Sequence, residues 1–155
     1  MQAPIRMPVE ERKALPTAAT QSQRVRDVMR RDFITISREE SLLEALHLMR
    51  LARLRHLAVV NEGVLVGILS YRDLQDELVA RLDLESAPAI EQIAVVERMI
   101  GTPFSIVPDA TLLEAASRLE RLRVGCLPVV EPGEQGLRLV GLLTEMDLLR
   151  AAYGV

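Results

Sequence analysis

The chain contains one sequence pattern twice, and this internal repeat constrains its fold more than any other feature. Residues 25–60 align with residues 95–130 without a gap, and LLEA occurs at the same place in both copies, at Leu42–Ala45 and Leu112–Ala115. After a short insertion in the second copy, LVGILSYRDL aligns with LVGLLTEMDL. Each copy of about 60 residues is too small to bury a good core alone. We therefore expect the two copies to pack on each other.

Each copy predicts the same order of secondary-structure elements. The β-prone stretches FITIS and FSIV come first. Next comes a capping box, Ser41-x-x-Glu44 or Thr111-x-x-Glu114, which marks the start of a helix with apolar residues at helical spacing. LAVV and LPVV begin a second strand, a turn follows, and VLVGILS or LRLVGLLT forms a third strand that leads into a last helix. The sequence predicts an α/β fold of two β-α-β-β-α units, each preceded by a short helical lead-in, VRDVM or VVERM.

The repeat also divides the chain into segments. Residues 1–22 contain proline breaks and no periodicity, so we expect an N-terminal extension outside both repeats. We assign residues 23–86 to the first domain and residues 87–155 to the second, with the linker LESAPAI at residues 84–90.

Composition narrows the class of protein. The net charge of −3 shows no basic excess, so we expect no nucleic-acid partner. No apolar run approaches the roughly 20 residues that a membrane span needs, and the N-terminus lacks the apolar stretch of a signal peptide. One cysteine, Cys126, and two histidines, His47 and His56, cannot build a zinc site of the usual spacing. These observations favour a soluble cytoplasmic protein.

The residues that carry chemistry in the repeat form a heptad, GILSYRD at Gly67–Asp73 and GLLTEMD at Gly141–Asp147. Its hydroxyl and its aspartate have the spacing of a capping box, and this role alone would explain both residue types. Its glycine lies near the end of a strand, where glycine often marks the close approach of a ligand or of another backbone. Both interpretations remain open on spacing alone.

The predicted hairpins give the heptad a geometric context. A turn centred near Gly63 places His56 opposite Ser70, and the same register places Cys126 opposite Thr144. The last helix then begins beside the start of the middle strand. Free N–H groups at a helix N-terminus, together with a hydroxyl, can bind an anion, and a carboxylate one turn further can accept hydrogen bonds from a sugar diol. This combination suits a nucleotide.

These motifs resemble a tandem pair of CBS domains, the cystathionine-β-synthase-type module also called a Bateman module. The similarity is carried by VRDVM, TIS, SLLEAL, RHLAVV and LVGILSYRDL in the first copy, and by VVERM, SIV, TLLEAA, GCLPVV and LVGLLTEMDL in the second. The resemblance implies two domains related by a pseudo-twofold axis, with their sheets facing across a ligand cleft. It also implies a stand-alone regulatory module that binds an adenosine compound (AMP, ADP, ATP or S-adenosylmethionine) and signals to an unknown partner protein.

The resemblance also assigns candidate nucleotide-binding residues. It implies that the aspartate holds ribose and the hydroxyl holds phosphate, in two sites that each draw on both copies. The first site comprises Ser70, Arg72 and Asp73 with Met99, Phe104, Gly125 and Cys126. The second site comprises Thr144, Met146 and Asp147 with Met29, Ile34, Arg55 and His56. Arg72 is either a phosphate ligand or a solvated side chain at the helix start.

The first copy departs from the family pattern at one position of the middle strand. Ala58 stands where the family usually has a proline, which the second copy keeps at Pro128. The loss would let the entry of the middle strand move, and it weakens the expectation for the Asp147 site.

We expect at least a homodimer, because two small units leave apolar helix faces that need cover. Members of the family associate through such helices. The faces comprise Leu74, Leu78, Val79, Ile93 and Val96.

Two other functions compete with nucleotide sensing. A hydrolase built on His56, Ser70 and Asp73 is disfavoured, because the second copy has Cys126 in place of the histidine, and we therefore expect no enzyme. The second rival is a structural dimerisation module whose pockets stay empty. The Arg-rich runs at residues 50–55 and 118–123 are either solvated helix ends or a phosphate clamp at the cleft.

Overall fold

In a computed structural model, which describes residues 22–82 and 89–155, the first copy folds into the predicted order of elements and the second does so except at its first strand. Residues 1–21 of the expected extension and residues 84–88 of the expected linker lie outside the described residues. The first copy contains α2 (Val25–Val28), β1 (Thr35–Ser37), α3 (Leu42–Leu51), β2 (His56–Asn61), β3 (Val64–Ser70) and α4 (Tyr71–Leu82). The second contains the 3₁₀ turns η1 (Ile90–Gln92) and η2 (Val95–Glu97), then β4 (Ile100–Gly101), α5 (Leu112–Leu122), β5 (Cys126–Gly133), β6 (Gly136–Thr144) and α6 (Glu145–Tyr153).

The capping boxes start the middle helices, as predicted. The hydroxyl of Ser41 accepts a hydrogen bond from the backbone N–H of Glu44 at 3.1 Å, and that of Thr111 accepts one from Glu114 at the same distance. Each satisfies a backbone donor that the first turn of a helix leaves without a partner. No helix within the described residues is long and apolar enough to cross a membrane.

The strands pair in the same way in both copies. β1 runs parallel to β2, and β2 pairs antiparallel with β3, as β5 does with β6. The stretch FSIV of the second copy differs from the prediction, because it forms a single parallel bridge, Ile106 with Val129, in place of a full strand. Pro103 and Pro108 flank this stretch, and proline has no N–H to donate to a strand ladder.

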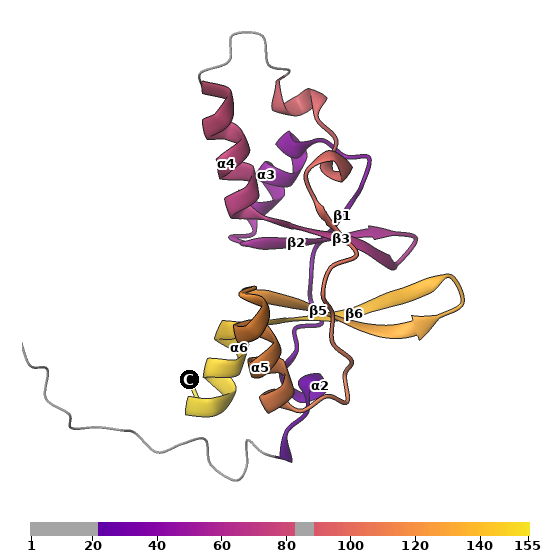
Figure 1. Cartoon of the computed structure of the whole chain (residues 1–155), viewed down its shortest axis with the longest axis vertical. Coiled ribbons are helices and arrows are strands. Elements are labelled where there is room, and N and C mark those ends of the chain that lie inside the picture. Colours follow the sequence, from indigo (N-terminus) through magenta and orange to yellow (C-terminus); the bar gives the residue numbers. More distant parts are fainter. Residues whose placement is uncertain (1–21, 83–88) are drawn as a thin grey trace, which may run out of the picture.

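The strands connect in the order β1-β2-β3-β6-β5, with β4 beside β3. Within this order the strands of the two copies face each other, and the β2–β3 and β5–β6 hairpins are joined at one point (Figure 1). β3 meets β6 at a single residue pair, Val64 with Arg138. Beside it, the carbonyl of Gly63 accepts a hydrogen bond from the backbone N–H of Leu139 at 3.1 Å. Both contacts lie near the turn ends of the hairpins. At the opposite ends, where α4 and α6 begin, β3 and β6 form no further residue pair within the described residues.

The two copies exchange their lead-in segments. Val25 of α2 is buried in the core of the second copy, with Ile106 and Leu112, whereas Val95 of η2 and Ile93 are buried in the core of the first. Figure 1 shows α2 beside α5, and the turns that precede β4 beside α3 and α4. Each core is therefore completed by a segment of the other copy, which is the reciprocal packing that a pseudo-twofold axis produces.

A third apolar cluster lies between the sheets. Ala58, Val130 and Leu139 are buried together, and Phe33 packs against them. Ala58 is fully buried and pairs regularly within β2, so the missing proline leaves the strand intact. The protein's own side chains therefore fill part of the space between the sheets.

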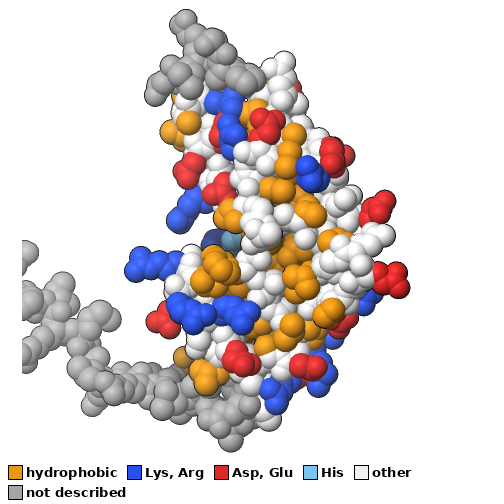
Figure 2. Space-filling model, turned by 45° about the vertical axis from the view of Figure 1, so that its right-hand side comes forward, with side chains coloured by type: hydrophobic (Ala, Val, Ile, Leu, Met, Phe, Trp, Pro, Cys, Tyr) orange, Lys and Arg blue, Asp and Glu red, His pale blue; other side chains and the backbone are white. Residues whose placement is uncertain are grey.

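Exposed apolar side chains remain on the last helix of each copy. Leu74 and Ile93, two of the five residues expected to need cover, are instead buried in the chain's own first core. Figure 2 shows hydrophobic side chains gathered over the middle of another face, with charged ones along its margins. The large exposed apolar residues of the last helices are Val79, Leu82, Met146, Leu149 and Tyr153.

Candidate functional site

The hydroxyl and the aspartate of each heptad form a capping box. In the first copy, the Ser70 hydroxyl donates to Asp73 Oδ2 at 2.5 Å and accepts from the backbone N–H of Asp73 at 3.1 Å. In the second copy, the Thr144 hydroxyl donates to Asp147 Oδ2 at 2.7 Å and accepts from the Asp147 N–H at 3.3 Å. Each hydroxyl has a single proton and already donates it to the aspartate, so neither hydroxyl can donate to a phosphate without giving up that hydrogen bond.

The heptad glycines make room for a methionine from the other copy's lead-in. A Cβ on Gly141 would lie 2.6 Å from Sδ of Met29, and one on Gly67 would overlap Sδ of Met99. In both places a backbone carbonyl of the same lead-in lies 3.1 Å from that Cβ position. Glycine thus marks the close approach of another backbone, one of the two options predicted, so these glycines give no independent evidence for a ligand.

The second aspartate is buried and already paired. Asp147 is 6% exposed, the most buried charged side chain within the described residues. Its Oδ1 accepts a hydrogen bond from Nε of Arg30 at 3.1 Å, and Nη1 of Arg150 lies 3.9 Å from the same oxygen. The sequence analysis identified Met29 as a site residue but missed its neighbour Arg30. The sequence did hold one signal for Arg30, because an arginine directly follows a predicted site residue.

The first aspartate is more open. Asp73 is half-buried, and the Ser70 cap occupies its Oδ2. Within residues 22–82 and 89–155, its Oδ1 makes no hydrogen bond or ion pair. This oxygen is therefore free to accept hydrogen bonds from a ligand.

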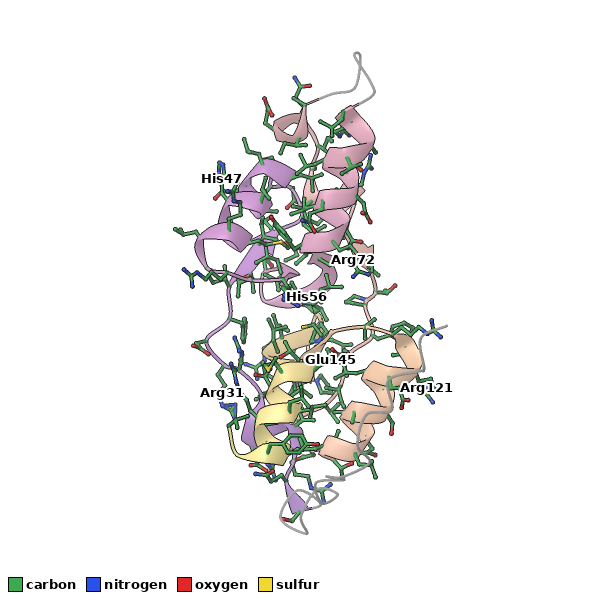
Figure 3. The ribbon with its side chains drawn as sticks, turned by 90° about the vertical axis from the view of Figure 1, so that its left-hand side faces the viewer. Arg31, His47, His56, Arg72, Arg121 and Glu145 are labelled. Atoms are coloured by element: carbon green, nitrogen blue, oxygen red, sulfur yellow. The ribbon has the colours of Figure 1, made fainter. Side chains whose placement is uncertain are left out.

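His56 lies where the two units meet. The predicted pairs His56–Ser70 and Cys126–Thr144 are both present. The His56 ring comes from the first copy and lies against Gly125 of the second, where a Cβ would be 3.4 Å from its Cε1. Figure 3 shows His56, Arg72 and Glu145 at the level where the N-terminal ends of α4 and α6 face each other.

The pKa of His56 is lowered, first by burial of its ring. The carboxylates of Asp73 and Glu145 oppose this shift, and the nearby Arg55 adds to it. The neutral imidazole is consequently favoured in the folded protein.

Neither candidate nucleophile at the unit boundary is activated. The Ser70 hydroxyl donates to Asp73, and no hydrogen bond joins it to His56 within the described part of the chain. Burial, followed by the charge of Asp147, raises the pKa of the Cys126 thiol to about 12. A serine hydrolase needs a serine–histidine hydrogen bond and a cysteine enzyme needs a thiolate, so the arrangement does not favour either.

The remaining predicted site residues are exposed. Arg72 and Met146 lie in the first turns of α4 and α6, and Arg55 directly precedes β2. Ile34 and Phe104 are also exposed. The assignment of these two residues to the site rests on the resemblance.

Two hollows on the surface lie away from both aspartates. Two hollows of about 480 and 560 Å³ are lined mostly by second-copy residues and by α2 with its flanking residues. Neither is lined by Asp73 or Asp147. We therefore locate the candidate site by its converging polar groups. Among the described residues, no group of three or more His, Cys, Asp or Glu side chains is placed to hold a metal ion.

The tandem α/β units, their exchanged lead-ins and their two capped aspartates define a paired-domain module. A model of the CBS domain family matches residues 25–80 and 90–154. The chain belongs to the CBS domain family.

Curated relatives place this module in different contexts. The chain is 33% identical over 127 residues to homoserine O-acetyltransferase of Methanococcoides burtonii, covering 81% of this chain and 23% of that protein. It is 28% identical over 124 residues to the CBS domain-containing protein YhcV of Bacillus subtilis, covering 80% of this chain and 81% of that protein. The match to the acetyltransferase thus concerns less than a quarter of the enzyme.

Solved structures share the fold. The protein AcuB from Vibrio cholerae superposes with a TM-score of 0.71 at 32% identity, covering 85% of this chain and 92% of that one. CBSX2, from Arabidopsis thaliana, was solved in complex with AMP. It superposes with a TM-score of 0.70 at 26% identity, covering 84% of this chain and 96% of that one.

Proposed function

We propose that this CBS pair is a regulatory module that binds an adenosine compound (AMP, ADP, ATP or S-adenosylmethionine) and signals its presence to a partner protein. The observation that carries the proposal is the free Oδ1 of Asp73, a half-buried carboxylate oxygen at a helix N-terminus beside His56 and the second copy. The AMP complex of the similar protein CBSX2 supports the choice of ligand.

The proposed chemistry follows from the groups that meet at the unit boundary. Oδ1 of Asp73 would accept hydrogen bonds from a ribose diol while Oδ2 keeps the helix capped. The N-terminal end of α4 carries a partial positive charge, and Arg72 adds a full one, so both would favour phosphate nearby. We therefore shift the phosphate role from the hydroxyls of Ser70 and Thr144 to these cations. The other site residues, which were assigned from the family resemblance, remain proposals.

We further propose that two chains associate through their last helices. The exposed Val79 and Leu82 of α4, with Met146, Leu149 and Tyr153 of α6, supply an apolar surface for this contact. Light scattering on the purified protein should give at least twice the chain mass of 17.3 kDa at micromolar concentration. A mass of one chain under these conditions would contradict the dimer.

The decisive experiment is calorimetry with AMP, ADP, ATP and S-adenosylmethionine on the wild type and on Asp73→Ala. Losing a charge-assisted hydrogen bond of about 1.5–3 kcal/mol should weaken binding at this site about tenfold to a hundredfold. Glu114→Ala is the matched control, because Glu114 holds the same capping position in α5, away from the site. This control should weaken a helix cap and leave ligand affinity unchanged.

The rival function is a structural dimerisation module with empty pockets. The capping roles of both aspartates and the packing of both heptad glycines are compatible with it. If none of the four adenosine compounds binds the wild type at millimolar concentration, the regulatory proposal fails and the structural module stands.

A further inference from the structure

Arg30 approaches Asp147 from the other copy of the repeat. Its backbone is fixed against β6 by two hydrogen bonds with Leu142, of 2.9 and 3.0 Å. From there its guanidinium reaches the carboxylate of Asp147 in the first turn of α6. The two residues are 117 positions apart in the sequence. The Arg30 side chain is 44% exposed, whereas Asp147 is 6% exposed, so the guanidinium lies between the carboxylate and solvent.

The first copy's aspartate meets an uncharged residue at the equivalent place. Ile100 corresponds to Arg30 in the repeat, and it pairs with Ile68 of β3 as Arg30 pairs with Leu142 of β6. Ile100 cannot form an ion pair, and Oδ1 of Asp73 has no partner within the described residues. The same backbone arrangement therefore presents a cation to one aspartate and an aliphatic side chain to the other.

This difference changes what a ligand must do to use each aspartate. At Asp147, a ribose diol must share Oδ1 with the Arg30 guanidinium or displace it. Displacement costs the buried carboxylate its Arg30 hydrogen bond and leaves it with the Thr144 cap and Arg150, 3.9 Å away, while Arg30 loses its carboxylate partner. This is unfavourable unless the ligand replaces both sides of the Arg30–Asp147 interaction. A ligand that carries phosphate can do so, because its diol can bind the carboxylate while its phosphate binds the guanidinium. Neutral adenosine lacks the second group, and a sulfonium ligand brings a positive charge beside Arg30.

We propose that Arg30 makes the Asp147 site selective for phosphorylated adenosine compounds over uncharged or cationic ones. Ile100 imposes no such selection on the Asp73 site. The inference rests on the proposed function and deepens it, because it assigns different ligand preferences to two sites that the repeat makes look equivalent.

The test uses AMP and adenosine as probes and compares their dissociation constants by calorimetry. Asp73→Ala leaves the Asp147 site as the reporter, and in this background AMP should bind at least about tenfold more tightly than adenosine. Adding Arg30→Ile, which installs the first copy's residue, should reduce this preference to what Arg150, 3.9 Å from Oδ1 of Asp147, and the start of α6 still provide. The reciprocal Ile100→Arg, in an Asp147→Ala background, should increase the preference for AMP at the Asp73 site beyond what Arg72 and the start of α4 already give.

Arg31→Ile is the matched control. Arg31 follows Arg30 directly, carries the same charge and donates to the backbone carbonyl of Arg26. Figure 3 shows Arg31 to the left of Glu145, at the edge of the view. In the Asp73→Ala background, this variant should keep the preference for AMP.

Each outcome decides the inference. A preference that Arg30→Ile reduces and Arg31→Ile keeps supports selection by Arg30. Equal losses with both variants would assign the preference to general electrostatics, and an equal loss of AMP and adenosine affinity with Arg30→Ile would reduce Arg30 to a structural partner of Asp147. Either result overturns the inference and leaves the proposed function standing. If the wild type binds neither probe nor any other adenosine compound, both fail together.

Discussion

Glu77 connects the last helix of the first copy to the lead-in of the second, and its removal offers a quantitative test of the exchanged architecture. Its Oε2 accepts a hydrogen bond from Nε of Arg98 at 2.6 Å. Its Oε1 accepts one from Nε of Arg81 on the same helix at 2.8 Å. The Glu77 side chain is 16% exposed and that of Arg98 is 40% exposed. The ion pairs are therefore partly shielded from water.

The expected cost of Glu77→Ala lies between the values for buried and surface pairs. A hydrogen bond to a charged group contributes about 1.5–3 kcal/mol, whereas an exposed ion pair contributes about 1 kcal/mol or less. Since solvent reaches Arg98, we expect a loss of about 1–2 kcal/mol in the free energy of unfolding. For a chain of this size, each kcal/mol lowers Tm by about 2–4 °C.

Urea unfolding, followed by far-UV circular dichroism at low and high salt, measures this cost. Asp76→Ala is the matched control, because Asp76 is an exposed acid on the same helix and has no ion pair within the described residues. The two hydrogen-bonded arginines, Arg98 first and then Arg81, lower the pKa of Glu77. A lowered folded pKa gives stability that is present above the unfolded value of 4.5 and is lost as pH falls through the folded value. Glu77→Gln should remove that part of the pH dependence.

The second copy holds its last helix against the other copy's lead-in without this ion pair. Ala151 and Val28 hold the positions equivalent to Glu77 and Arg98, so the same junction there is apolar. If charge holds the first copy's junction, the destabilisation by Glu77→Ala should shrink with added salt, because salt screens partly exposed ion pairs. An effect no larger than that of Asp76→Ala, or one that salt leaves unchanged, would show that packing, and not charge, holds the lead-in to α4.

Three further predictions concern the unit boundary. The folded protein lowers the pKa of His56, so as pH falls the unfolded chain binds a proton at this histidine before the folded protein does. Unfolding midpoints should therefore fall as pH drops below 6.5, and His56→Gln should reduce this fall. Cys126 is buried with a pKa of about 12, so a thiol reagent should label it at neutral pH only when urea unfolds the protein, and rapid labelling of native protein would contradict the structure. Gly141→Ala should cost about 1–3 kcal/mol through overlap with Met29, and Met29→Ala in the same chain should relieve part of that cost; independent, additive losses would count against the contact.

Local patterns predicted most of the fold, because the relevant interactions lie within a few residues of each other. The capping boxes at Ser41 and Thr111 start helices where the spacing placed them. The register of His56 against Ser70 followed from a turn near Gly63, which adopts a φ of 80° that favours glycine. The capping role of both heptads was one of two readings of the same spacing, and the structure confirms it.

Features that join distant segments were not predictable in this way. Nothing local to Val25 or Val95 indicates that each completes the core of the other copy. The contact between Arg30 and Asp147 depends on that exchange, because the position of α2 in the second core carries Arg30 to β6. An arginine next to a predicted site residue was visible in the sequence, but its partner was not.

The exchange also explains why two copies of one repeat present their aspartates differently. Each lead-in must be held against the other copy, and both copies use an ion pair, but at different places. In the first copy the pair is Arg98 with Glu77, one turn beyond Asp73 in α4, so the carboxylate of Asp73 keeps a free oxygen. In the second copy the pair is Arg30 with Asp147 itself, so the same interaction occupies the carboxylate. The position of the arginine in each lead-in therefore determines whether the aspartate is already in an ion pair. Asp73 can bind a ligand without breaking one, and Asp147 cannot.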